Sequence, residues 1–260
     1  MIRATAKSSP GSPATSSPRP ERPSGFFIAD YADSIFGPVS APKPEVFPPS
    51  ATAWTRLASA SEALRTTLRQ EFIEGGRVPH LCLRDAILPE RAEALHQALR
   101  DARFVRHHHG PYPLHIAPLA QQAPSALTDF CAWLKSADGA AFHAALVGWP
   151  QPLETRQVQV SRMEVGEHFP EHRDTDEEGL AVVYNFTRPW EDRFGGVLTF
   201  RHPEVDADLM RVPPLFNSVF IFRARGAPHR VTEWTSAAQG HQRYSITAFI
   251  LARAEAPHSR

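Results

Sequence analysis

Six short segments rich in β-branched and aromatic residues follow one another after Glu154, and no helix-length segment separates them. They cover 156–163, 180–186, 197–201, 217–223, 230–234 and 243–251, with glycine, proline and acidic turns between them. Strands joined by turns pair antiparallel, because parallel neighbours need a long crossover connection. The pattern therefore predicts an antiparallel sandwich or barrel and argues against a doubly wound parallel sheet.

Helical patterns and one further strand precede this region. Residues 51–76 predict a packing helix that ends at Gly75-Gly76 and carries along one side Trp54, Leu57, Leu64, Leu68 and Phe72. A strand is expected over 78–88, and helices over 89–105 and 125–134. Residues 77–254 are thus expected to form one domain, an α+β unit with an all-β core and flanking helices.

The two ends of the chain lack the composition of a folded core. The first 50 residues contain ten of the 25 prolines and nine serines, with few periodic apolar positions. Such a segment cannot bury enough apolar surface to offset the entropy lost on ordering. We expect a disordered tail over 1–50 and a second short tail over 255–260.

Charge, hydropathy and cysteine content exclude several function classes. The 28 basic residues equal the 28 acidic ones, which removes the overall attraction that nucleic-acid and anionic-membrane binding draw on. No apolar run approaches the roughly 18 residues of a membrane span, and no signal-peptide core follows the start. Cys82 and Cys131 give no disulfide framework and are expected to be buried thiols. We expect a soluble, cytoplasmic protein with no nucleic-acid or membrane partner.

His172-Arg173-Asp174, followed by His229, is the pattern with the clearest chemistry. Side chains two apart on an extended chain share a face, so His172 and Asp174 can point at one spot. Two imidazoles and one carboxylate on one face of an octahedral metal make a ferrous site with three open positions. The alternative is that His172 and Asp174 lie in a surface loop and His229 is a hydrogen-bonded structural histidine.

Arg243 opens the last apolar strand, 14 residues after His229. On that strand Arg243, Ser245 and Thr247 share a face and would project into the same interior as the metal. An arginine in a barrel interior requires an anion. A dicarboxylate that chelates iron at one end would supply that anion at the other, which is the binding mode of 2-oxoglutarate. An edge-strand arginine paired with an acidic side chain is the alternative.

Several segments together resemble a known family. They are HLCLRDAILPE at 80–90, His172-x-Asp174, VVYNFTRPW at 182–190, GGVLTF at 195–200, NSVFIF at 217–222, PHRV at 228–231 and RYSIT at 243–247. In this order they resemble the prolyl 4-hydroxylase-like branch of the iron(II)/2-oxoglutarate-dependent oxygenases, over roughly residues 78–252. Gly195-Gly196 are interpreted as turn glycines rather than catalytic residues.

The resemblance implies a double-stranded β-helix, a jelly-roll or cupin-like fold, and a dioxygenase. His172, Asp174 and His229 would hold Fe(II), and Arg243 would pair with the far carboxylate of 2-oxoglutarate. Ser245, Thr247 and either Tyr184 or Asn185 would be further contacts, with Asn185 favoured. Only one of that pair can face inward, because adjacent strand residues point to opposite faces. Ascorbate would serve as a reductant.

The same resemblance implies hydroxylation of a prolyl residue, a free amino acid or another small molecule, coupled to oxidative decarboxylation of 2-oxoglutarate. The partner would thus be a small-molecule or a protein or peptide substrate, and the sequence does not indicate the oligomeric state. Repair of alkylated nucleic acid is disfavoured, since the second arginine of those enzymes is replaced here by Phe249. The segment 233–242 makes the His229–Arg243 spacing longer than is usual in the family. The alternative function is a non-catalytic β-barrel module that binds or senses a metal or ligand.

Overall fold

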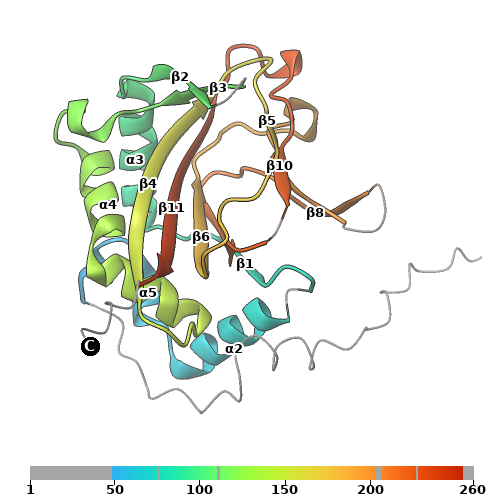
Figure 1. The fold of residues 1–260 in the computed structure, drawn as a ribbon. Helices are drawn as coiled ribbons and strands as arrows, with labels where there is room; N and C mark the ends of the chain where they lie inside the picture. The colour runs from blue at the N-terminus through green and yellow to red at the C-terminus, as the bar shows by residue number, and fades with distance from the viewer. Residues whose placement is uncertain (1–48, 75, 110–111, 203–206, 227, 254–260) are drawn as a thin grey trace, which may run out of the picture.

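The computed structural model describes residues 49–74, 76–109, 112–202, 207–226 and 228–253 (Figure 1). The tail predicted over 1–50 lies outside these ranges except for Pro49 and Ser50, and the tail over 255–260 lies outside them entirely. The described residues form two β-sheets that face each other, with helices against the outer face of the larger one (Figure 1).

The larger sheet has seven strands and the smaller sheet four. In spatial order the larger sheet contains β1 (His80–Arg84), β9 (Ser218–Arg223), β6 (Gly179–Asn185), β11 (Arg243–Ala252), β4 (Leu153–Met163), β3 (Tyr112–Ile116) and β2 (Val105–His109). The smaller sheet contains β5 (Phe169–His172), β10 (His229–Val231), β7 (Leu198–Arg201) and β8 (Asp208–Val212). Every pairing between these strands is antiparallel, as predicted. The arrangement is a double-stranded β-helix.

Four α-helices complete the described fold: α2 (Glu62–Ile73), α3 (Pro89–Asp101), α4 (Ala126–Lys135) and α5 (Ala137–Val147). Their apolar sides, including Leu95 and Phe130, form one core with Val160, Val182 and Ile246 of the larger sheet. Short 3-10 turns lie at η1 (Pro49–Ala53), η2 (Arg56–Ser59), η3 (Leu119–Gln121), η4 (Asp192–Phe194) and η5 (Ser236–Ala238).

Alternation along β11 divides its side chains between two environments. Tyr244, Ile246, Ala248 and Ile250 join the core beneath the helices. Arg243, Ser245, Thr247 and Phe249 point to the opposite face, where they line a cavity between the two sheets. The sheet thus buries one face in apolar packing and turns a partly polar face toward the smaller sheet.

The continuous helix predicted over 51–76 is wrong in its first half. Residues 49–59 form the two 3-10 turns η1 and η2, and α2 begins only at Glu62. Ala60 is extended, and the Ser61 hydroxyl accepts a hydrogen bond from the Leu64 amide, which starts a new helix there.

The two cysteines differ in their exposure. Cys82 is exposed on β1 rather than buried, whereas Cys131 is buried as expected.

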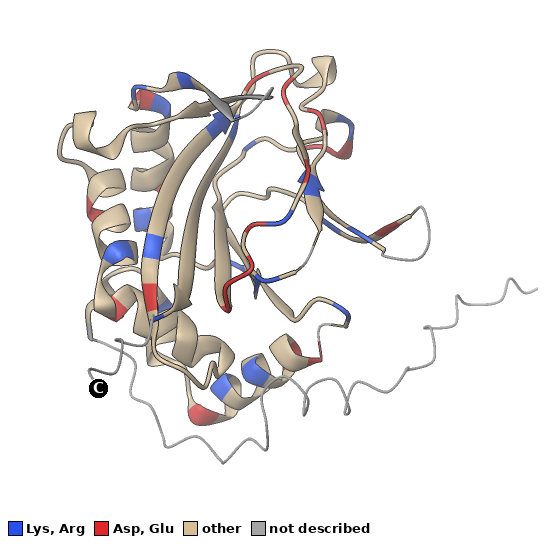
Figure 2. Ribbon diagram, viewed as in Figure 1, with Lys and Arg blue, Asp and Glu red and all other residues tan. Residues whose placement is uncertain are grey.

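Charged residues of both signs are interspersed over the visible elements (Figure 2). This agrees with the equal numbers of acidic and basic residues in the sequence. No helix among the described residues has both the length and the apolar character that a membrane span requires.

Candidate active site

Three potential metal ligands meet where β5 and β10 run side by side. His172 ends β5 and pairs directly with His229 at the start of β10, and Asp174 follows two residues after His172. The Nε2 atoms of both histidines lie 3.4 Å from Asp174 Oδ1. All three ligand atoms lie within 4.8 Å of one another. The structure therefore brings together the three residues that the sequence indicated, although they come from segments 55 or more residues apart.

The surroundings of Asp174 and His172 suit metal binding. Burial would raise the pKa of Asp174, but hydrogen bonds and charge from His172 and His229 outweigh it and hold that pKa below its usual value. His172 Nδ1 lies 2.9 Å from the Pro170 carbonyl oxygen and donates to it, so Nε2 is left to act as a ligand. An imidazole–imidazole–carboxylate set of this kind could hold Fe(II).

Arg243 lies buried at another part of the same cavity, with 5% of its surface exposed. Its Nε donates to the Gly196 carbonyl at 2.8 Å, and its NH1 group donates to Ser245 Oγ at 3.2 Å. Burial lowers the pKa of Arg243 to about 10, so the guanidinium stays charged at neutral pH. None of the described carboxylates pairs with it. A buried charge without a counter-ion is expected to bind an anion.

The cavity that connects these groups has a volume of about 310 Å³. Its wall includes the three candidate ligands together with Arg243, Ser245 and Thr247. Ser245 Oγ also lies 2.8 Å from Ser161 Oγ on the neighbouring strand β4. A guanidinium and hydroxyls on one side and a metal-type cluster on the other suit a small dicarboxylate between them.

Tyr184 and Asn185 lie on opposite faces of β6, and neither lines the cavity. The Tyr184 hydroxyl lies 2.9 Å from His143 Nε2 on α5, on the helix side of the sheet, so Tyr184 does not contact the cavity. Asn185 is on the cavity side and buried, and its Nδ2 donates to Ser218 Oγ at 3.4 Å. Its Oδ1 is buried without a hydrogen-bond partner among the described atoms.

The sequence reasoning missed much of the cavity wall. The missed lining residues include Leu114 and Ile116 of β3, Gln157, Gln159, Ser161 and Met163 of β4, and Phe169 of β5. The sequence of β4 could have predicted part of this wall, because Gln157, Gln159 and Ser161 alternate with Val158 and Val160 and therefore share one face of the strand. The strand was predicted, but its inward face was not assigned.

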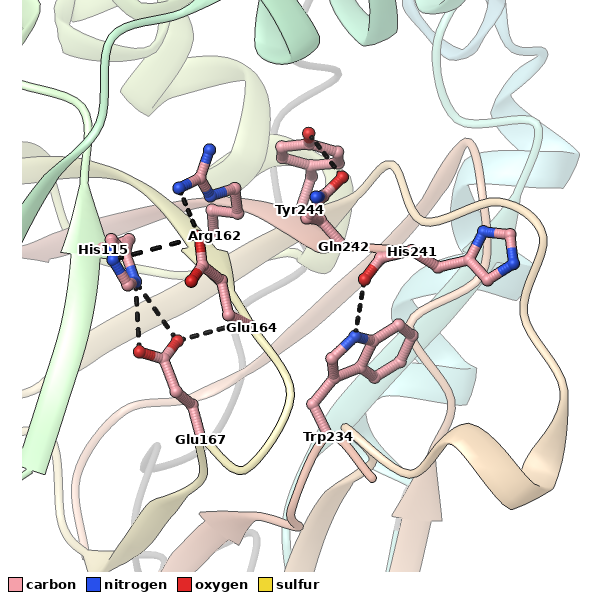
Figure 3. A network of polar contacts seen from close by, with 8 residues as sticks. All are labelled: His115, Arg162, Glu164, Glu167, Trp234, His241, Gln242 and Tyr244. Atoms are coloured by element: carbon pink, nitrogen blue, oxygen red, sulfur yellow. Dashed lines mark hydrogen bonds and ion pairs between the residues drawn. The ribbon is translucent and has the colours of Figure 1, made fainter. Parts of the chain in front are cut away.

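A polar network fixes the turn between β4 and β5 beside the cavity (Figure 3). Glu167 accepts from the Glu164 amide at 2.8 Å and pairs with His115 Nδ1 of β3 at 3.1 Å. The Trp234 amide donates to the Glu167 carbonyl, and Trp234 Nε1 donates to the His241 carbonyl. The long segment before Arg243 therefore packs inward, with Trp234 fully buried, and helps position the turn that leads to His172.

Residues 158–251 match the family model described as the 2OG-Fe(II) oxygenase superfamily. No curated protein matches the sequence.

Solved structures share the fold at low sequence identity. A Pseudomonas putida prolyl-4-hydroxylase is 16% identical, with a TM-score of 0.54 over 72% of this chain and 100% of that one. An oxidoreductase of the 2OG-Fe(II) oxygenase family from Burkholderia pseudomallei is 15% identical, with a TM-score of 0.56 over 74% and 93%. A Trichoplax adhaerens prolyl hydroxylase, in complex with a hypoxia inducible factor peptide fragment, is 13% identical, with a TM-score of 0.56 over 74% and 90%. These similarities confirm the double-stranded β-helix.

Proposed function

We propose that this chain is an oxygenase of the 2OG-Fe(II) superfamily that uses Fe(II) and 2-oxoglutarate, and that it hydroxylates a prolyl residue, a free amino acid or another small molecule. The observation that supports this most is the presence of an open-sided His-Asp-His cluster and a buried, anion-seeking arginine in one cavity. A structural metal site would need neither the open positions nor the arginine.

In this proposal His172, Asp174 and His229 hold Fe(II), and Arg243 pairs with the distal carboxylate of 2-oxoglutarate. Bound there, the metal and cosubstrate supply an oxidative decarboxylation in which one atom of O₂ enters succinate, CO₂ leaves, and the other atom becomes a substrate hydroxyl. Ser245 orients the guanidinium through its hydrogen bond, and Thr247 adds a hydroxyl farther along the same face. Asn185 pairs with Ser245 across β6 and β11 but does not line the cavity, so we do not expect it to contact the cosubstrate directly.

The chain's apolar residues protect this chemistry from water. Phe200 and Phe222 lie with ring centroids 5.3 Å from that of His229, and His229 itself is buried. His172 is more open, with 29% of its side chain exposed. Solvent and substrate therefore reach the metal cluster from the His172 side, while the His229 side is dry.

The proposal is tested by succinate release in the presence and absence of added Fe(II), 2-oxoglutarate and ascorbate. Succinate formation should require both iron and cosubstrate, and His172→Ala should abolish it. His168→Ala is the matched control, since His168 is exposed four residues away and does not line the cavity. Unchanged turnover in His172→Ala would contradict the metal assignment.

A thermal-shift experiment separates the oxygenase from the alternative of a non-catalytic binding module. A ligand that binds the folded protein but not the unfolded chain raises the melting temperature. 2-Oxoglutarate should do so only when a divalent metal is present, because in the proposal the metal forms part of its binding site. Stabilisation by 2-oxoglutarate without metal, together with no succinate, would favour the binding module.

A further inference from the structure

The solvent-accessible end of the cavity is lined by polar side chains that the iron and 2-oxoglutarate sites do not use. Gln157 on β4 and Arg173 after β5 both line the cavity and are exposed, and Gln159 lies next to Gln157 on the inward face of β4. By contrast, Arg243, Ser161 and Ser245 are buried. A second molecule that enters the cavity therefore meets the two glutamines and Arg173 first.

Strand register separates this polar end from Arg243. Arg243 pairs with Met163, whereas Thr247 pairs with Gln159 and Phe249 with Gln157. Four residues of strand span about 13 Å, and the five-carbon chain of 2-oxoglutarate spans roughly 5 Å. The cosubstrate held by Arg243 therefore leaves Gln157 and Gln159 free to contact another molecule.

At the solvent-accessible end of the cavity, which we call the entrance, the net charge is set by Arg173. The acidic turn that follows it, residues 176–178, does not set this charge. Asp176 and Glu177 do not line the cavity, and Glu178 accepts hydrogen bonds from Arg223 and Arg225. Arg173 has no ion-pair or hydrogen-bond partner among the described residues. The turn therefore does not make the entrance acidic, and Arg173 leaves an uncompensated positive charge there.

The charges inside the cavity balance without Arg173. Fe(II) carries two positive charges and Arg243 one, while the 2-oxoglutarate dianion and the Asp174 carboxylate together carry three negative charges. A substrate with one carboxylate would neutralise Arg173, and a guanidinium binds a carboxylate through paired hydrogen bonds.

The glutamine pair offers both a donor and an acceptor in the same cavity as this charge. Gln157 Nε2 donates to Gln159 Oε1 over 3.4 Å, which is long and therefore weak. Gln157 Oε1 and Gln159 Nε2 are left for a ligand, because neither has a partner among the described atoms. An amide oxygen can accept from an ammonium group, and an amide nitrogen can donate to a carboxylate or hydroxyl.

We propose that the substrate is a free α-amino acid, whose carboxylate pairs with Arg173 and whose amino group is bound at Gln157 and Gln159. This inference rests on the proposed function and selects one of its substrate classes. The cavity volume of about 310 Å³ agrees with it, because it lies at the low end for ligand pockets and must hold the cosubstrate as well.

The test compares the twenty protein amino acids with their α-carboxamides, which keep the side chain and amino group but lose the negative charge. Iron-loaded full-length protein is incubated with 2-oxoglutarate and each compound, and succinate and a gain of one oxygen atom are measured. At least one free acid should be hydroxylated, with a kcat/KM tenfold or more above that of its carboxamide. Arg173→Gln should raise the KM for the acid about tenfold or more and reduce the difference between acid and carboxamide. Arg193→Gln, at an exposed arginine outside the cavity, should change neither value.

Three results would overturn the inference while leaving the oxygenase function intact: no response to any free amino acid, equal rates for acids and carboxamides, or hydroxylation of prolyl peptides alone. For each of these results, metal-dependent binding of 2-oxoglutarate is also measured by thermal shift on the same preparation, as a check that the proposed function holds. If that binding is absent, the proposed function itself has failed. Arg173→Lys should recover part of the preference for the acid, which a purely structural role of Arg173 would not produce.

Discussion

Gly196 lies directly against the side chain of Arg243. Its carbonyl accepts the hydrogen bond from Arg243 Nε at 2.8 Å, and a Cβ atom at this position would lie 2.8 Å from Arg243 Cδ. The same Cβ would lie 2.7 Å from Trp234 Cε3, and Gly196 has a positive φ of 64°. The turn glycine expected from the sequence is therefore also required by the packing of the buried Arg243 side chain.

Gly196→Ala is expected to weaken 2-oxoglutarate binding by displacing the guanidinium. We expect the KM for 2-oxoglutarate to rise tenfold or more, measured by succinate release at saturating Fe(II). Gly240→Ala is the matched control, because Gly240 also has a positive φ but has no atom within 4 Å of the added Cβ. Both variants carry about 1–2 kcal/mol of backbone strain. Equal KM values in the two variants would show that the Gly196 contact does not position Arg243.

Arg243→Met should remove the anion anchor without removing the metal cluster. A hydrogen-bonded charged group contributes about 1.5–3 kcal/mol, which corresponds to a rise of roughly tenfold to 150-fold in the KM for 2-oxoglutarate. Binding of Fe(II) or Ni(II), measured by calorimetry, should be retained because Arg243 is not among the candidate ligands. Unchanged cosubstrate affinity would show that the arginine was assigned wrongly.

The sequence predicted the metal cluster better than the rest of the cavity wall. Metal ligation permits few residue types, so the chemistry of His172, Asp174 and His229, together with the resemblance of the ordered segments to a known family, could select these three residues. Strand alternation then gave the inward side of β11 correctly for Ser245 and Thr247. The contact of Gly196 with Arg243 could not be predicted, because it joins residues 47 apart through packing that local periodicity does not encode.

Helix α5 and strand β2 are among the elements that the sequence did not predict, and the physical reasons differ. The helix α5 is buried on nearly all sides, so its sequence lacks the apolar stripe of a surface helix. Strand β2 (Val105–His109) contains three consecutive histidines, a polar pattern that does not by itself predict a strand. In both cases tertiary packing, rather than the local pattern, determines the secondary structure.

Tyr184→Phe is expected to change stability but not cosubstrate binding. The substitution removes the hydrogen bond between the hydroxyl and His143 Nε2, at a cost of about 1 kcal/mol in the free energy of unfolding. Ser245→Ala should instead raise the KM for 2-oxoglutarate, since Ser245 Oγ accepts from Arg243. Denaturant unfolding and succinate kinetics on the two variants measure both effects. A raised KM in Tyr184→Phe would contradict the placement of Tyr184 on the helix side.

The buried imidazole of His143 should make the protein less stable below neutral pH. Burial lowers the pKa of His143 to about 4, and its Nδ1 donates to the Gly139 carbonyl, which opposes this shift only in part. In the unfolded chain a histidine has a pKa of about 6.5, so between about pH 6.5 and 4 the unfolded state binds a proton that the folded state does not.

The free energy of unfolding should therefore be highest above pH 6.5 and fall as the pH decreases, by roughly 2 kcal/mol between pH 7 and pH 5 from this residue. His143→Gln should be less stable at pH 7, because it loses packing against Trp133 and Phe142, but its pH dependence should be shallower. Urea unfolding of both proteins at several pH values, with a chelator present, measures the difference in slope. The pKa of His96 is also lowered by burial, so the wild-type slope alone does not report on His143. Parallel slopes for the two proteins would show that His143 is not held neutral in the folded state.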